Sequence, residues 1–192
     1  HGQLLFEGPL DEDALSLPVR TGKARVIGIE PASLVTRGLI REVKTDEAGL
    51  FQPALNPGLA KVAVIERHKR TGKLGVGILE GYGLRGGAIA TTIAHDSHNI
   101  VVAGDNDPDM LLAVRELADM GGGIVSVHGG AIRRLPLPIA GLMTSADPQE
   151  VSAILHDMLV AAHAELGIPE DVEPFMTLSF MALPVIPELK LT

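Results

Sequence analysis

Four short apolar runs between residues 61 and 104 constrain the fold of this chain more than any other feature. Glycine or polar residues bound them, and they occupy residues 62–65, 74–79, 88–94 and 100–103. Short apolar runs rich in β-branched residues predict buried strands. The sequence therefore predicts a central sheet, with the remaining residues packed around it or placed over one of its ends.

The bulk composition excludes several classes of protein. The chain has 192 residues and a net charge of −8, which argues against the basic face that nucleic-acid binding needs. It contains no cysteine, so disulfides and thiolate metal sites are excluded, and a cytoplasmic location is expected. No apolar run approaches the roughly 18–20 residues of a membrane span. We expect one globular domain without a membrane or nucleic-acid partner.

Further strands are predicted on both sides of the central runs. Residues 24–29 and 34–43 alternate loosely, and residues 124–127 and 131–135 form a hairpin around Gly129 and Gly130. Residues 1–18 contain an acidic, proline-containing stretch typical of a connecting segment. The predicted division is a connecting segment over residues 1–18 and one domain over residues 19–192.

Two helices are predicted at about residues 107–120 and 147–166. In each, an aspartate (Asp107 or Asp147) precedes a proline, which suits an N-cap followed by the first helical position. Apolar residues follow at helical spacing in both segments. His156 and His163 lie off the apolar stripe of the second helix, and we expect both to be exposed.

The last 19 residues, 174–192, are unusually apolar for a terminus. We expect them to dock on the core as a strand or an extended segment. The predicted fold class is α/β or α+β, with a mixed β-sheet of roughly seven to nine strands packed by two main helices. These patterns leave the strand order open.

The densest group of reactive side chains follows the third apolar run: His95, Asp96, Ser97, His98 and Asn99. Function is common where polar residues follow a buried strand. Imidazole and carboxylate groups bind Zn, Fe or Mn, and they also transfer protons. The alternative is a structural turn in which Asp96 and Asn99 bond their own backbone. A metal site, a substrate-contacting or acid–base site, and a structural turn all remain open.

A second polar group, Glu66, Arg67 and His68, follows the first apolar run. It is a second candidate for the same site, and its alternative is a solvated strand end. Ser97 lacks the G-x-S-x-G elbow of a hydrolase nucleophile. Residues 81–86, GYGLRG, match G-x-G-x-x-G, but a strand and not a helix is predicted after them, so we reject a dinucleotide site.

Three long segments carry a resemblance to a known family. They are residues 61–104 (KVAVIERHKRTGKLGVGILEGYGLRGGAIATTIAHDSHNIVVAG), 136–143 (PLPIAGLM) and 174–192 (PFMTLSFMALPVIPELKLT). In this order and at this spacing they resemble the C-terminal domain of microbial adenine deaminases, and the resemblance covers residues 34–192.

The resemblance implies a member of the amidohydrolase superfamily that acts in purine metabolism. Such enzymes hydrolyse adenine to hypoxanthine and ammonia at a dinuclear Mn or Fe site in a (β/α)₈ barrel. The barrel's metal-binding histidines begin with an H-x-H pair, which this sequence lacks. The expected partners are therefore the amidohydrolase barrel domain, adenine and, as a further option, other copies of the chain in a homo-oligomer. The metal is expected outside this chain, which alone should be inactive.

Within that expectation, the group at residues 95–99 faces the mouth of the barrel and shapes or closes the base pocket. His95, Asp96 and His98 are the candidate catalytic residues. The candidates for substrate binding or interdomain contact are Ser97, Asn99, Glu66, Arg67 and His68. Two alternatives remain: a structural interdomain or oligomerisation module, and a stand-alone domain that binds a small ligand.

Overall fold

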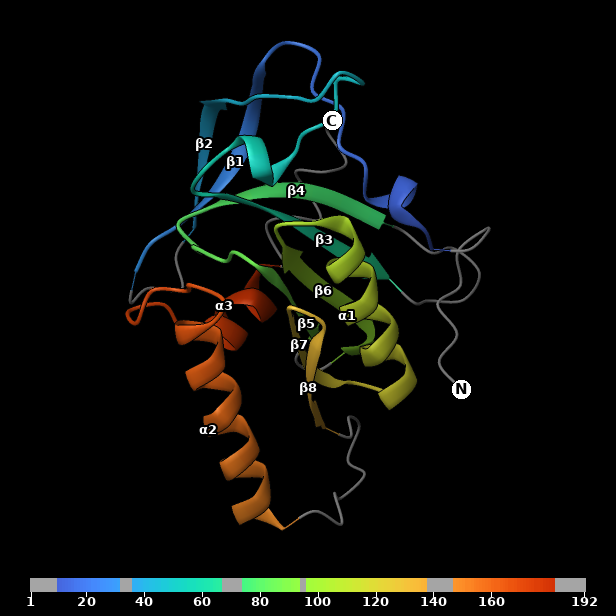
Figure 1. The fold of residues 1–192 in the computed structure, drawn as a ribbon, viewed down its shortest axis with the longest axis vertical. Coiled ribbons are helices and arrows are strands. Elements are labelled where there is room, and N and C mark those ends of the chain that lie inside the picture. Colours follow the sequence, from blue (N-terminus) through green and yellow to red (C-terminus); the bar gives the residue numbers. More distant parts are fainter. Residues whose placement is uncertain (1–9, 32–35, 67–73, 94–95, 138–146, 182–192) are drawn as a thin grey trace.

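The computed structural model describes residues 10–31, 36–66, 74–93, 96–137 and 147–181. These residues form one eight-stranded sheet in the order β2-β1-β4-β3-β6-β5-β7-β8 (Figure 1). Only β1 and β4 pair in parallel, and the other neighbours are antiparallel. The strands are β1 (Lys23–Ile29), β2 (Thr36–Glu42), β3 (Leu59–Glu66), β4 (Leu74–Glu80), β5 (Gly87–Ile93), β6 (Asp96–Gly104), β7 (Gly123–His128) and β8 (Ala131–Pro136). The predicted mixed sheet is confirmed.

The first long helix, α1 (Asp107–Met120), has the predicted bounds but a different cap. Asn106, and not Asp107, is the N-cap, and its side-chain oxygen accepts a hydrogen bond from the Asp109 amide at 2.9 Å. Asp107 instead lies in the first turn, where its carboxylate pairs with Lys61. The helix ends at Gly121, whose φ of 80° is the left-handed conformation that glycine adopts without strain.

The second long helix, α2 (Pro148–Ala164), begins as predicted. The Asp147 side chain accepts a hydrogen bond from the Gln149 amide at 3.0 Å. His156 is exposed, but the expectation for His163 was wrong. The His163 side chain is only 15% exposed, and its Nδ1 lies 2.8 Å from the carbonyl oxygen of Ile168 because the chain turns back across it after α2.

A third helix, α3 (Pro174–Phe180), lies where the sequence suggested an extended segment. The Glu173 carboxylate caps it by accepting the Met176 amide hydrogen bond, and Pro174 occupies the first turn. An acidic residue before a proline was the same signal that predicted the other two helices. Residues 182–192, the remainder of the predicted docked segment, lie outside the described residues.

The helices cover opposite faces of the sheet (Figure 1). Alternate residues of each strand point to opposite faces, so each buried strand supplies both layers of core. One layer joins the sheet to α2 and α3 through residues such as Val62, Val101, Met158, Phe175 and Leu178. The other joins it to α1 through residues such as Ala63, Val102, Val114 and Leu117. None of the described helices is long and apolar enough to cross a membrane.

A buried ion pair ties residues near the N-terminus to the sheet. Lys61 on β3 is 1% exposed, and its Nζ donates to Asp107 Oδ1 at 2.7 Å and to the carbonyl oxygen of Leu15 at 2.8 Å. Leu15 ends the 3-10 helix η1 (Glu12–Leu15) and is fully buried beside α1. A second 3-10 helix, η2 (Pro53–Leu55), lies between β2 and β3.

Candidate functional site

The structure brings two of the predicted polar groups to the same end of the sheet. Glu66, the last residue of β3, is paired in register with Asn99 on β6. On the other side of β6, Ile93 at the end of β5 pairs with Asp96. We call this end of the central strands, formed by Glu66, Ile93 and residues 96–99, the Asn99 end of the sheet. It brings Glu66 next to a segment that follows it by some 30 positions in the sequence.

The backbone conformation of residues 96–99 differs from the predicted turn. These residues begin the strand β6, and the β5–β6 ladder shifts register between Thr92 and Ile93. The shift places Asp96 opposite Ile93 and Ile100 opposite Thr92, and a strand continues past an irregularity of this kind. Arg67, His68 and His95 lie outside the described residues, so the structure does not test whether His95 and His98 converge.

Side-chain hydroxyls fasten β5 to its neighbours near this end. Thr92 Oγ1 accepts a hydrogen bond from the Gly123 amide at 3.2 Å, where β7 begins. Thr91 Oγ1 lies 3.2 Å from Ser179 Oγ on α3. Sequence reasoning missed these contacts, because hydroxyl residues 31 or 88 positions apart carry no pattern that connects them. They fix α3 and β7 to the strand that precedes the candidate site.

The described residues do not fit a metal centre. No group of three or more His, Asp or Glu side chains within this part of the chain is arranged to hold a metal ion, and cysteine is absent from the sequence. A dinuclear centre needs several such ligands around each ion. These residues therefore lack the ligand set that a dinuclear Mn or Fe site requires.

The GYGLRG segment is a loop that holds elements together, and the structure confirms that it is not a dinucleotide fingerprint. It leads into the strand β5 and not into a helix. A Cβ at Gly81 would lie 2.7 Å from the carbonyl oxygen of Ile29 on β1, and one at Gly83 would lie 2.7 Å from Pro169. The following amides of Gly86 and Gly87 donate to the Asp105 carboxylate at 2.6 and 3.1 Å. The glycines thus permit close backbone packing.

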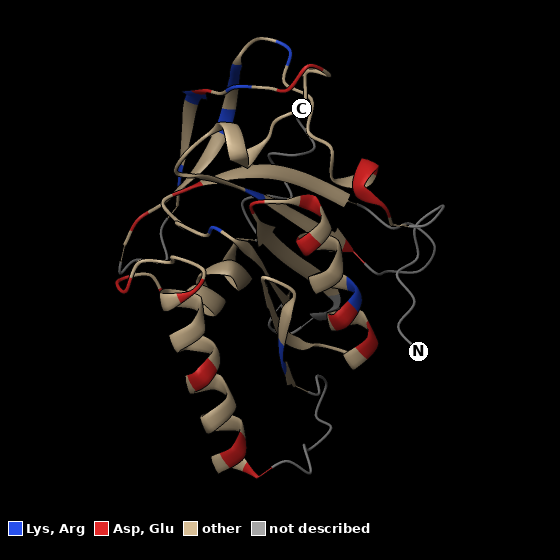
Figure 2. Cartoon of the chain, viewed as in Figure 1, with Lys and Arg blue, Asp and Glu red and all other residues tan. Residues whose placement is uncertain are grey.

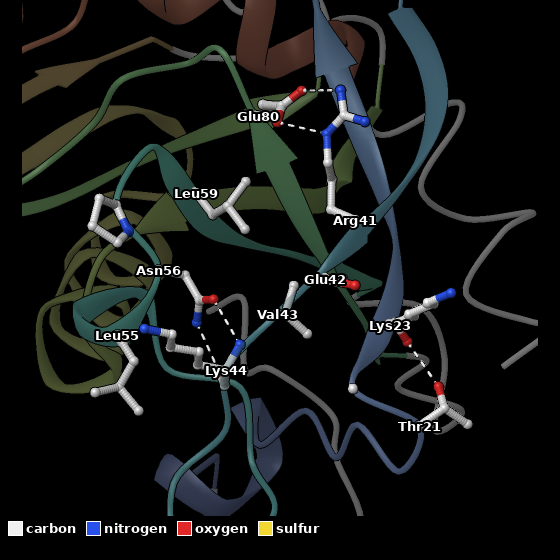
Figure 3. Close-up of a pocket in the computed structure, with 12 residues that line it drawn as sticks. Thr21, Lys23, Arg41, Glu42, Val43, Lys44, Leu55, Asn56, Leu59 and Glu80 are labelled. Atoms are coloured by element: carbon white, nitrogen blue, oxygen red, sulfur yellow. Dashed lines mark hydrogen bonds and ion pairs between the residues drawn. The ribbon is translucent and has the colours of Figure 1, made fainter.

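A pocket with both charged and apolar lining residues lies elsewhere, between the β1–β2 ribbon and the chain around η2 (Figure 3). It is an open depression of about 630 Å³, and neither Glu66 nor Asn99 lines it. Asn56 forms one wall of the pocket. Its side chain accepts a hydrogen bond from the Lys44 amide at 2.8 Å and donates one to the Lys44 carbonyl oxygen at 2.9 Å. At another wall, Arg41 donates two hydrogen bonds to the Glu80 carboxylate at 3.0 and 3.2 Å.

The charges around this pocket do not converge on a common point. The Arg41 guanidinium is engaged by Glu80, which raises the pKa of Arg41 above its ordinary value through hydrogen bonding and charge attraction. The side chains of Lys23 and Lys44 extend in opposite directions (Figure 3). A small-ligand site normally directs a few polar groups at one place. The geometry therefore favours a surface depression over a small-ligand site.

Comparison with known families decides the identity of the domain. The family model described as adenine deaminase C-terminal domain matches residues 33–192. This chain belongs to the adenine deaminase C-terminal domain family. The strand β1 (Lys23–Ile29) lies before the matched range, yet it sits inside the sheet between β2 and β4. Residues outside the matched range therefore complete the fold.

Individual adenine deaminases match nearly the whole chain. The adenine deaminase of Nitratidesulfovibrio vulgaris strain Hildenborough is 62% identical over 185 residues, which cover 96% of this chain and 32% of that protein. Adenine deaminase 2 of Carboxydothermus hydrogenoformans is 48% identical and the adenine deaminase of Clostridium acetobutylicum 46% identical, each over 95% of this chain and 32% of its own length. The chain spans about a third of the length of the curated relatives it matches.

Proposed function

We propose that this chain is the C-terminal domain of an adenine deaminase, and that the complete polypeptide hydrolyses adenine to hypoxanthine and ammonia. The observation that carries the proposal is the 62% identity to an adenine deaminase across 96% of this chain. The partner of the domain is then the preceding amidohydrolase barrel domain, and adenine is the substrate. The cytoplasmic location stays a prediction, with which the absence of cysteine is compatible.

The metal belongs to the preceding domain in this proposal. The described residues lack a group suited to hold a metal ion, which supports placing a dinuclear Mn or Fe centre outside them. The role of the present chain is to add polar groups to the edge of the base pocket and to hold them in place.

The Asn99 end is the part of the chain proposed to face that pocket. Backbone pairing fixes Glu66 beside Asn99, and a paired sheet holds groups more rigidly than a free loop does. Asp96 and His98 lie on the same strand, before Asn99. His95, Ser97, Arg67 and His68 complete the proposed set, by position in the sequence.

Hydrolysis of adenine requires proton transfer, which we place at the Asn99 end. Water adds to the carbon that carries the amino group of adenine, and the amino nitrogen must gain a proton to leave as ammonia. Imidazole and carboxylate side chains exchange protons near neutral pH, which makes His95, Asp96 and His98 the proposed acid–base candidates. Asn99 and Glu66 are proposed to contact the base or the preceding domain.

A stand-alone ligand-binding domain is less well supported. The described depression of about 630 Å³ has diverging lysine side chains and an arginine already paired with Glu80. The chain has one tyrosine and no tryptophan, so it is also poorly supplied with rings on which a free base could stack.

The test uses the complete polypeptide with substitutions at the Asn99 end. We expect Asp96→Asn and His98→Ala each to lower kcat/KM for adenine by about tenfold or more, because acid–base groups contribute at least that much. His156→Ala is the matched control, because His156 is an exposed histidine on α2. It should stay within about twofold of the parent. Unchanged kcat and KM in both Asn99-end variants, with unchanged melting temperatures, would remove these residues from the site.

A further inference from the structure

The regular pairing of β5 ends on both sides at one residue, Thr92. On the side of β7, the described ladder ends with Thr91 opposite Ile124, and the next pair in that register would be Thr92 with Gly123. On the side of β6, pairing is regular up to Thr92 opposite Ile100, after which the register shifts. Thr92 therefore stands at the boundary between the regular sheet and the Asn99 end.

The Thr92 hydroxyl occupies the place of the next backbone pair between β5 and β7. Its Oγ1 accepts a hydrogen bond from the Gly123 amide at 3.2 Å, and it lies 3.5 Å from the Gly123 carbonyl oxygen, a longer contact in which it donates. One side chain thus meets both backbone groups of Gly123, which would otherwise need partners from the strand. The contact holds β5 beside β7 at the point where backbone pairing stops.

Gly123 is a rigid point of attachment. It begins β7 shortly after α1 ends, where the amide of Gly122 donates to the carbonyl oxygen of Leu117 at 3.2 Å. Its φ is 132°, and a Cβ there would lie 2.1 Å from the carbonyl oxygen of Leu135 on β8. Because α1 and β8 both restrict Gly123, a group bonded to it is fixed relative to the core.

The pairing with β6 changes at the same step of β5. Ile93 pairs with Asp96, whereas the register of the preceding pairs would bring it to Asn99. Residues 97–99 are therefore additional on β6, although Asn99 stays in register with Glu66 on β3. Irregularities of this kind re-aim side chains and are frequent beside active sites. The backbone position of Asp96 thus depends on where the end of β5 is held.

The groups that hold the end of β5 are neutral. Figure 2 shows charged residues along α1, α2 and the β1–β2 ribbon, whereas the sequence of β5, GAIATTI, contains none. Thr92 is half-buried, and its partner is a backbone amide. Salt screens ion pairs between exposed charges, but it does not screen a hydrogen bond between neutral groups in this way. Any effect of the Thr92 hydroxyl should therefore be independent of salt.

We propose that Thr92 is a positioning residue for the deamination of adenine. Its hydroxyl fixes the end of β5, and the end of β5 fixes the backbone of Asp96 through the pair with Ile93. The inference rests on the proposed function, which gives Asp96 and His98 their acid–base roles. A misplacement of about 1 Å in a catalytic group can cost about 100-fold in rate, so one hydrogen bond behind the site is sufficient to matter.

Thr91 provides the comparison that separates positioning from stability. Its hydroxyl also joins β5 to another element, because its Oγ1 lies 3.2 Å from Ser179 Oγ on α3. Its backbone, however, lies inside both ladders, opposite Val101 on β6 and Ile124 on β7. Removing the Thr91 hydroxyl therefore deletes a hydrogen bond without releasing the end of the strand.

The test measures kcat and KM for adenine in the complete polypeptide, at low and high salt. We expect Thr92→Val, which keeps the shape and removes the hydroxyl, to lower kcat about tenfold at both salt concentrations, with KM within about twofold. Thr92→Ala, which cannot crowd Gly123, should show the same loss. Thr92→Ser keeps the hydroxyl and should stay within about threefold of the parent. Thr91→Val should lower the melting temperature as much as Thr92→Val but leave kcat within about twofold.

A double-mutant cycle tests whether Thr92 acts through the acid–base groups. In a polypeptide that carries Asp96→Asn and His98→Ala, adding Thr92→Val should lower kcat no further, because the groups that it positions are absent. A full additional loss in that background overturns the inference, as does a parent-like kcat in Thr92→Val or an equal loss in Thr91→Val. The proposed site survives these outcomes if Asp96→Asn and His98→Ala alone lower activity, whereas parent-like activity in those two variants overturns both.

Discussion

Tyr82 connects two parts of the fold through a single buried side chain. It is the only tyrosine in a chain without tryptophan, and it is fully buried. Its hydroxyl donates to the Pro174 carbonyl oxygen and so joins the loop after β4 to α3. Burial, and to a smaller extent the nearby charge of Glu173, raises the pKa of Tyr82 well above its ordinary value.

The raised pKa of Tyr82 predicts a loss of stability in alkali. Below a pH of about 10 the phenol is neutral in both states, so its titration does not change the free energy of unfolding. Above that pH the unfolded chain releases the proton while the folded chain retains it. The free energy of unfolding must then fall as the pH rises.

Tyr82→Phe isolates this effect. We expect it to cost about 1 to 2 kcal/mol at neutral pH, because the Pro174 carbonyl oxygen loses its donor. We also expect a shallower decline in stability above a pH of about 10 than the parent shows. Urea unfolding followed by circular dichroism at several pH values measures both. Equal alkaline slopes for the two proteins would mean that the Tyr82 phenol does not carry this dependence.

At the scale of elements, patterns local in sequence predicted most of the secondary structure. Apolar runs bounded by glycine or polar residues marked β3, β4, β5 and β6, and aspartate–proline pairs marked α1 and α2. Asn106 replaced Asp107 as the cap of α1 because the Asp107 carboxylate is drawn to the buried Lys61 ammonium. Lys61 and Asp107 lie 46 positions apart, so no local sequence pattern predicts their contact. The helix α3 was missed although Glu173 and Pro174 gave the same capping signal, because seven residues are too few to show a helical repeat.

The pairing of β5 with β7 depends on glycine at position 87. A Cβ at Gly87 would lie 1.8 Å from the carbonyl oxygen of Val127, which is backbone and cannot rotate away. The same Cβ would also crowd Leu166, at 2.9 Å. Any side chain at this position must therefore separate the two strands.

Gly87→Ala is expected to destabilise the chain by about 3 kcal/mol or more, since the ladder must shift to admit the methyl group. Gly129→Ala is the matched control in the β7–β8 turn. Its φ is 54°, and a Cβ there meets nothing within 4 Å, so only backbone strain of about 1 kcal/mol is expected. Thermal unfolding of the two variants checks the order. Equal losses of stability in the two variants would show that the close approach of β5 and β7 does not restrict the residue at position 87.

At the scale of the whole molecule, the sequence predicted the fold class but not the strand order. The order β2-β1-β4-β3-β6-β5-β7-β8 depends on pairings such as that of β1 with β4, which lie far apart in the chain. The pairing of Glu66 with Asn99 likewise required the structure, although both residues were candidates from the sequence. The roles of the side chains at residues 95–98 stay predictions, because the proposal places them against a domain that the structure does not contain.

The proposed function divides the work between this chain and a preceding metal-binding domain. The described residues provide no group suited to hold a metal ion, and the chain corresponds to about a third of each adenine deaminase that it matches. In the proposed function, the chain supplies positioned polar groups and the preceding domain supplies the reacting centre.

The most direct measurement is ammonia release from adenine, with Mn²⁺ or Fe²⁺ supplied, by the 192-residue chain alone and by the complete polypeptide. We expect the complete polypeptide to convert adenine to hypoxanthine, and the chain alone to leave adenine unchanged. Turnover by the chain alone, or a complete polypeptide without activity on adenine, would contradict this account.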